Sequence, residues 1–186
     1  MDERTETEVA PMKNRTTVER KSERELVVTR TFNGPARLVF EAWTKPELFR
    51  QWWVPKSLGM SLLSCEMDVR VGGRYRLEFA HGDSQAAFFG TYREVTPHSR
   101  LVWTNEESDE GSVTTVTFAE KGGKTLLVMH ELYPSKEALD AAGTGAASAT
   151  VTAVRRARIR RGQASSTTIS ARMNSSHFAE RSTPSR

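Results

Sequence analysis

The spacing of apolar residues changes near Pro55, from a helical repeat before it to alternation after it. Residues 25–32 come first and alternate polar with apolar side chains, which predicts a strand that Asn33-Gly34-Pro35 ends with turn chemistry. A helix is expected from Pro35 onward, because proline suits a first helical position. Apolar residues recur in that helix at three- and four-residue spacing, at Leu38, Val39, Ala42 and Trp43.

A second short helix is expected next, with Thr44 as its cap, Pro46 in its first turn and Pro55 as its end. The two-residue alternation that follows predicts six strands, at residues 65–69, 74–79, 86–95, 101–105, 112–119 and 124–132. Glycine pairs at 72–73 and 122–123 supply tight turns between them. One strand, two helices and then a six-strand meander is typical of an α+β fold.

A sheet of this kind has one apolar face, and two short helices cover little of it. A long amphipathic helix should therefore follow the last strand. Ser135 begins it as a cap, and Ala138, Leu139 and Ala141 are good helix formers. Gly143-Thr144-Gly145 then ends the pattern early.

Several short motifs within residues 25–142 resemble a known superfamily. The most specific are Trp52-Trp53-Val54-Pro55 and Arg70-Val71-Gly72-Gly73, in an order that also includes Arg30-Thr31-Phe32, Ala42-Trp43-Thr44, Gly90-Thr91-Tyr92-Arg93-Glu94-Val95 and Arg100-Leu101-Val102. This order resembles the SRPBCC or START-like superfamily, in the branch named after the activator of the ninety-kilodalton heat-shock protein's ATPase. The resemblance implies a helix-grip fold, in which a curved antiparallel sheet wraps around a long C-terminal helix with a cavity between them.

The C-terminal part of the chain departs from that family. Such proteins continue with an amphipathic stretch of the kind Phe-Asp-x-Leu-x-x-Leu, whereas this chain has the arginine-rich residues 154–161. Codons for these residues can be chosen so that the next frame reads Phe-Asp-Glu-Leu-Glu-Tyr-Val. We therefore hypothesise that a frameshift near residue 143 replaced the gripping helix; a natural basic tail is the alternative. Without that helix, we expect a poorly covered inner sheet face and an aggregation-prone or chaperone-dependent chain.

Charge divides the 186 residues in the same way. Residues 143–186 carry eight basic and one acidic side chain and contribute +7, whereas residues 23–142 are mildly acidic at −3, so the chain's net charge of +4 is due to the tail. We interpret residues 1–22 as a disordered extension, 23–142 as one domain, and 143–186 as a basic, low-complexity, disordered tail. Specific nucleic-acid recognition is not expected, because Phe178 is the single aromatic residue in the tail.

The compartment is suggested by two negative features. The one cysteine, Cys65, cannot form an internal disulfide and is expected to be a small core residue. No apolar run approaches the roughly eighteen residues that a membrane span needs, and the first 22 residues are charged throughout. These features predict a cytoplasmic protein with no membrane association.

The inward positions of the expected helices and strands are rich in aromatic side chains and methionine. Such a lining suits a small apolar or aromatic ligand, and it equally suits a core packed against a helix. The candidate lining residues are Trp43, Trp52, Trp53, Met67, Tyr75, Leu77, Phe79, Phe89, Trp103, Val116, Phe118 and Met129. The three tryptophans of the short helices are expected to close one end of the cavity.

Catalytic chemistry has one weak candidate, His130, which could act as an acid or base if it faced the cavity. A structural histidine is the alternative. The four histidines, at 81, 98, 130 and 177, have no ligand spacing with Cys, Asp or Glu, so no metal is expected. Nucleotide fingerprints and a Gly-x-Ser-x-Gly elbow are absent from the sequence, and no cofactor is expected.

Three functions stay open at this point. The first is binding of a small apolar molecule between the sheet and the helices. The second is a chaperone-interaction module, because the resemblance is to proteins that act on a heat-shock chaperone. The third is a cyclase-like enzyme, as in other proteins of this fold, and it depends on His130 facing inward.

Overall fold

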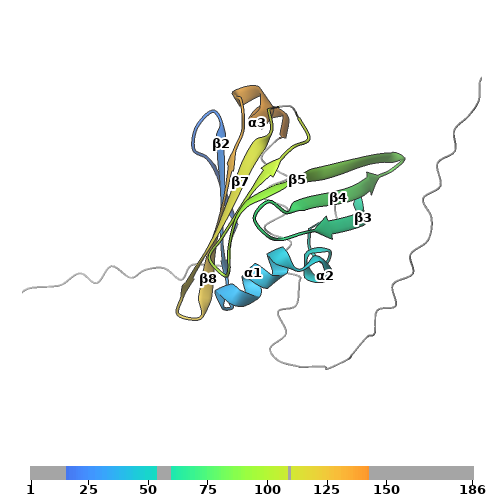
Figure 1. The fold of residues 1–186 in the computed structure, drawn as a ribbon. Coiled ribbons are helices and arrows are strands. Elements are labelled where there is room, and N and C mark those ends of the chain that lie inside the picture. The colour runs from blue at the N-terminus through green and yellow to red at the C-terminus, as the bar shows by residue number, and fades with distance from the viewer. Residues whose placement is uncertain (1–15, 54–59, 109, 143–186) are drawn as a thin grey trace, which may run out of the picture.

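The computed structural model describes residues 16–53, 60–108 and 110–142. Its elements follow the expected order of strand, short helices and meander (Figure 1). They are β1 (Thr17–Arg20), β2 (Glu25–Phe32), α1 (Ala36–Thr44), α2 (Pro46–Phe49), β3 (Met60–Met67), β4 (Arg74–His81), β5 (Ser84–Thr96), β6 (Arg100–Asn105), β7 (Ser112–Lys121), β8 (Lys124–Leu132) and α3 (Lys136–Ala142). Among these, no helix is long and apolar enough to cross a membrane.

The strands form one eight-stranded sheet in the order β1-β2-β8-β7-β6-β5-β4-β3, and each neighbouring pair is antiparallel. The fold is therefore the α+β, helix-grip type that the sequence predicted. The crossover that places β8 beside β2 brings the two ends of the domain together and leaves β1 and β3 as the edges.

The sheet begins earlier than the expected boundary at residue 23. Strand β1 pairs with β2, from Thr17 opposite Thr29 to Arg20 opposite Leu26. Val18 packs against the core from this edge, which explains why so short and charged a segment is ordered. The prediction of a disordered extension is thus wrong for residues 17–20. Residues 1–15 and the tail 143–186, with its frameshift hypothesis, lie outside the described residues.

The helices are capped partly as expected. Ser135 caps α3, since the Ala138 N–H donates to its Oγ at 3.2 Å. Thr44 does not cap α2, because its hydroxyl donates back to the Phe40 carbonyl at 2.9 Å and Lys45 takes the cap position. This back-bond is a common alternative for threonine near the end of a helix.

Helix α1 packs on one face of the sheet, and we call that face the inner face. The Trp43 ring of α1 lies 6.1 Å from that of Trp103 and 6.4 Å from that of Phe118, measured between centroids. Strand pairing extends this face, because directly opposed residues point to the same side. The glycine turn at 122–123 fixes the register of β7 and β8, with φ of 58° and 69° at its two residues, as a tight two-residue hairpin requires.

The core lies on this inner face and is well covered. Leu26, Val28, Val116 and Leu127 from the central strands have no exposed surface, and Leu139 from α3 belongs to the same cluster. The expectation of an open inner face is therefore wrong for these positions. The short helices α1 and α2 cover more of the sheet than their length suggested, because they carry three large aromatic rings, Phe40, Trp43 and Phe49, and Trp52 follows shortly after α2.

The outer edge strand β3 is irregular. Its pairing with β4 shifts between Leu62 and Ser64, so that Leu63 is an extra residue on the β3 side. This bulge leaves the Leu63 side chain 51% exposed. In Figure 1, β3, β4 and the start of β5 extend away from β2, β7 and β8. We call residues 60–67, 74–81 and 84–91 the wing.

Candidate functional site

An aromatic cluster fills the inner face beneath the two short helices. Trp52 lies 4.8 Å from Trp43 and 4.8 Å from Phe49, and Phe49 stacks on Trp53 at 4.6 Å. Phe40 adds an edge contact with Phe118 at 5.4 Å. Aromatic pairs at these separations contribute about 0.5–1.5 kcal/mol each beyond their buried area. This cluster anchors α1 and α2 to the sheet.

The two buried tryptophans differ in their polar contacts. Trp52 Nε1 donates to the Ala42 carbonyl at 2.9 Å. Four residues beyond Ala42 stands Pro46, which has no N–H to give that carbonyl its helical bond, so the indole replaces it. Trp43 Nε1 is buried and has no hydrogen-bond partner among the described residues. Trp52 is therefore the structural link between the two helices.

Most of the predicted lining residues lie on the inner face or in its helical cover. Trp43, Trp52, Tyr75, Leu77, Trp103, Val116, Phe118 and Met129 are buried there. Trp53 and Met67 are partly buried and pack against the same core, and Phe79 is half-buried. Their placement agrees with a packed core as well as with a ligand site, so a binding role for them stays a prediction.

Phe89 is on the wrong face. Pairing places Phe88, and not Phe89, opposite the inward Leu77, while Phe89 stands opposite Arg76. The Arg76 guanidinium lies 5.8 Å from the Phe89 ring centroid on the outer side. Adjacent strand residues point to opposite faces, so only one of the two phenylalanines can face inward. The inward residue is Phe88, so the prediction that Phe89 lines the cavity is wrong.

The wing carries the least covered aromatic residues of the inner face. Phe79 and Phe88 stack there with centroids 5.0 Å apart and nearly parallel planes. Phe88 is 41% exposed, whereas Trp103 and Phe118 on the same face are 8% and 5% exposed. The inner face thus changes from a closed core to an open aromatic surface along the sheet.

A hydrogen-bonded cluster lies at the inner ends of β6 and β7. The Asn105 Oδ1 accepts from Tyr75 Oη at 2.8 Å and from Trp103 Nε1 at 3.2 Å. Its Nδ2 donates to Ser112 at 2.9 Å and to Thr114 at 3.0 Å. One asparagine therefore satisfies four neighbouring groups, and burial raises the pKa of Tyr75 far above its ordinary value. These contacts serve packing rather than catalysis.

Glu131 is an inward carboxyl group that is not among the residues predicted from the sequence. It stands opposite Leu26 on one side and Thr114 on the other. Its Oε2 accepts a hydrogen bond from Tyr133 Oη at 3.2 Å. Burial is the main cause that raises the pKa of Glu131, partly offset by the Tyr133 hydrogen bond. The signal was present, because an inward Met129 requires that the residue two positions later also face inward.

His130 faces outward. It stands opposite Val27 and Thr115, between the inward residues Met129 and Glu131. Its Nε2 lies 3.5 Å from Glu25 Oε1, and both side chains are more than one-third exposed. The hypothesis of a cavity acid or base at His130 is wrong, since β-strand alternation turns this imidazole away from the inner face.

The remaining candidates for reactive chemistry are structural. Cys65 is buried in β3, and burial raises the pKa of its thiol, so it is a core residue as predicted. His98 lies in the β5–β6 turn with its ring edge-on to Phe40 at 5.6 Å. No group of three or more His, Cys, Asp or Glu side chains in the described ranges could hold a metal ion. His177 lies outside those ranges.

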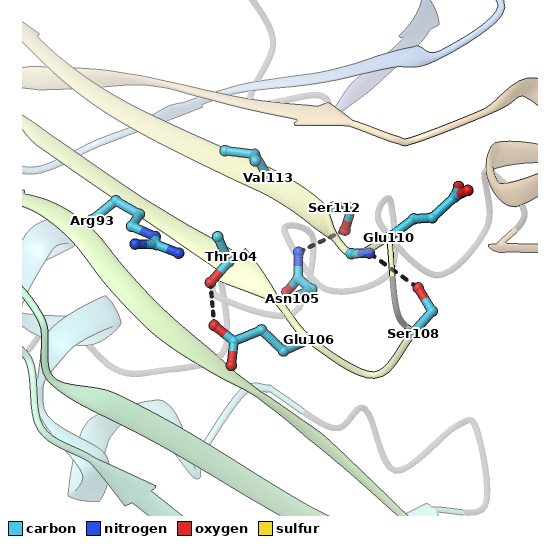
Figure 2. A pocket seen from close by; sticks show the side chains of 9 residues that line it. Arg93, Thr104, Asn105, Glu106, Ser108, Glu110, Ser112 and Val113 are labelled. Atoms are coloured by element: carbon cyan, nitrogen blue, oxygen red, sulfur yellow. Dashed lines mark hydrogen bonds between the residues drawn. The ribbon is translucent and has the colours of Figure 1, made fainter.

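A shallow pocket of about 480 Å³ lies at the β6–β7 hairpin (Figure 2). Its lining is polar: Arg93, Thr104, Asn105, Glu106, Ser108, Glu110, Gly111, Ser112 and Val113. Thr104 donates to Glu106 at 2.7 Å, and this hydrogen bond is the main cause that lowers the pKa of Glu106. The pocket contains charged groups of both signs and shares Asn105 and Ser112 with the inward hydrogen-bonded cluster.

Comparison with known proteins identifies one family. The family described as Activator of Hsp90 ATPase homolog 1-like protein matches residues 33–154, well over half of the chain. No curated protein matches the sequence.

Solved structures of the same fold are numerous. A Rhodobacter sphaeroides protein has 21% identity and a TM-score of 0.68, covering 76% of this chain and 93% of its own. Protein Ms6760 from Mycobacterium smegmatis has 20% identity and a TM-score of 0.67, covering 80% and 99%. An AHSA1-like protein from Aeromonas hydrophila has 21% identity and a TM-score of 0.59, covering 70% and 90%. At these identities the likeness shows the fold alone.

Proposed function

The chain belongs to the Activator of Hsp90 ATPase homolog 1-like family, and from this premise we propose that it is a binding module for a small apolar or aromatic molecule. The molecule would lie on the inner face of the wing, against the stacked rings of Phe79 and Phe88. The fold alone does not select this function, because one fold serves many functions.

The observation that carries the proposal is the open aromatic pair beside a closed core. Phe88 keeps 41% of its surface exposed although it points to the same side as the buried Leu77 and Tyr92. Burying apolar surface stabilises a complex by about 25 cal/mol per Å². A flat molecule placed on this pair would gain that energy without displacing any part of the packed core.

The surroundings of the pair support an apolar ligand. Leu62 stands opposite Phe79 on the inner face and is only partly buried. Met67 and Trp53 are also partly covered and border the core. Methionine and aromatic side chains adapt to ligands of different shapes. This set favours an aromatic or aliphatic body and offers no charged group for a strongly polar one.

The experiment compares two neighbouring phenylalanines. The full chain, labelled with ¹⁵N, is titrated with indole as the probe, and amide shifts are followed by NMR. Phe88→Ala removes the open inward ring, and Phe89→Ala removes the adjacent outward ring as the matched control. We expect Phe88→Ala to weaken indole binding roughly tenfold, by about the 1–1.5 kcal/mol of an aromatic contact, and Phe89→Ala to leave it unchanged.

The outcomes separate the proposed function from its rivals. Saturable shifts that map to β3–β5 and depend on Phe88 would support it. Equal losses in both variants, or no saturable shift, would overturn it. A heat-shock chaperone bound to the purified chain, in the absence of any indole binding, would favour the chaperone-interaction function instead.

A further inference from the structure

The inner face has a second accessible place, far along the sheet from the wing. Glu131 lies there in a row of opposed residues that runs from Arg20 through Leu26 and Glu131 to Thr114 and Trp103. Leu26 has no exposed surface and Thr114 has 2%. The Glu131 side chain is enclosed by protein atoms and still keeps a partly accessible surface, as a residue in a concave position does.

The described chain gives this carboxyl group a single hydrogen bond. Tyr133 Oη donates to one oxygen, and the Tyr133 ring itself packs partly against the core. A carboxylate can accept about four hydrogen bonds. The second oxygen of Glu131 therefore has free accepting capacity on the inner side.

Neighbouring polar groups do not use that capacity. The Asn105 amide nitrogen already donates to Ser112 and Thr114. The basic residue in the same row, Arg20, forms an ion pair with Asp140 of α3 at 2.6 Å. Glu131 thus faces inward with a neutral partner and without a basic partner in the described ranges, which is a costly position for a charge.

We propose that Glu131 and Tyr133 form a recognition site for the protonated amine of a small molecule with an apolar body. The ammonium group would donate to the free oxygen of Glu131, and the apolar body would lie against the partly buried ring of Tyr133. An amine supplies both the missing hydrogen bonds and the missing positive charge, and charge-assisted bonds are about twice as strong as neutral ones. An anionic ligand would be repelled.

The raised pKa of Glu131 agrees with this assignment, because burial disfavours its charged form and no cation among the described residues offsets that effect. A bound ammonium group would supply that stabilisation and lower the pKa of the carboxyl group. The groups that face it from the packed strands are Tyr133, Thr114 and Leu26, none of which is charged.

The test uses three probes of one shape on the full chain: 2-phenylethylamine, 2-phenylethanol and 3-phenylpropanoate. We expect the amine to bind most tightly, with Glu131→Gln weakening it roughly tenfold or more and leaving the alcohol unchanged. Glu25→Gln, which changes an exposed carboxylate on the outer side of the neighbouring strand, is the matched control and should have no effect.

A second measurement keeps the test decisive if the Gln variant is poorly folded. The ¹³C shift of the Glu131 carboxyl in the unchanged chain is titrated with pH, with and without saturating amine, and its pKa should fall when the amine is bound. Equal affinity of amine and alcohol, or a pKa that does not move, would overturn the proposal. Phe88→Ala should leave amine binding unchanged, so failure at the wing and failure at Glu131 are distinguishable.

Discussion

Two regions of the inner sheet face have the same alternating sequence pattern, but one region is buried and the other is exposed. Under α1 and α2, Trp103 and Phe118 are closed over by helical aromatic rings. On the wing, Phe79 and Phe88 stack on each other and stay accessible. In both regions every second residue of a strand faces inward, and aromatic residues stand among these inward positions. The difference is whether a helix side chain covers them, and the pattern along a strand does not contain that information.

The largest expected effect tests whether the covered region holds the fold together. Trp52→Ala removes the side chain that joins α1 to α2 and should lower the free energy of unfolding by about 3–5 kcal/mol. Phe88→Ala on the wing should cost about 1 kcal/mol, the value of one aromatic contact. Urea unfolding of both variants gives the comparison. Similar losses would show that the wing is part of the core rather than an open surface.

A smaller effect separates the two buried tryptophans. Trp52→Phe leaves the Ala42 carbonyl without its donor, because Pro46 cannot replace it. An unsatisfied buried acceptor costs about 1–3 kcal/mol. Trp43→Phe loses no hydrogen bond within the described residues and is the matched control. Trp43→Phe should therefore be the more stable of the two variants in urea unfolding. An equal loss of unfolding free energy in both would contradict the linking role of Trp52.

A pH effect is expected at Glu131, where the pKa is raised by burial above the ordinary value of 4.5. The folded chain then binds this proton more tightly than the unfolded chain does. Stability should consequently be higher below about pH 4.5 and decline as the pH rises through the folded pKa. Glu131→Gln should remove this component from the pH dependence of thermal unfolding. An unchanged profile in the variant would show that the group titrates normally.

The smallest effect is expected on the outer side of the sheet. His130→Ala breaks an exposed contact with Glu25 and should change the unfolding free energy by less than about 0.5 kcal/mol. Binding of indole or amine should not change. A clear loss of binding in this variant would mean that the outer side takes part in recognition, contrary to both proposals.

The sequence predicted the order of elements well because turns are local. Glycine pairs and the proline after β2 mark boundaries by their own backbone preferences. Strand β1 was missed, since an edge strand needs pairing on one side only and a single inward apolar residue, Val18, is enough to hold it. A four-residue segment is too short to show the alternating pattern by which strand pairing is predicted.

Which face of the sheet a strand residue points to was harder to predict than the presence of the strand. Phe88 and Phe89 are equally apolar, so their own side chains do not show which of them faces inward. The buried Tyr92 does show it, because residues 88, 90 and 92 lie on the same face of the strand. At β8 the run from Leu126 to Met129 is apolar on both sides, so alternation disappears just before His130. The inward carboxyl could still be found from Met129 by counting two residues. Helix cover, in contrast, depends on packing that no single strand encodes.

An open sheet also has consequences for how copies of the chain meet. Unpaired N–H and C=O groups at its two borders could recruit another molecule's strand. One border, β1, has four residues and carries Glu19 and Arg20, which disfavour close stacking of a like strand. The other, β3, is interrupted by the bulge at Leu63, which breaks the regular ladder that an incoming strand would need. The charged short strand β1 and the bulge in β3 therefore protect the chain against edge-to-edge polymerisation. This protection favours solubility and is separate from ligand binding.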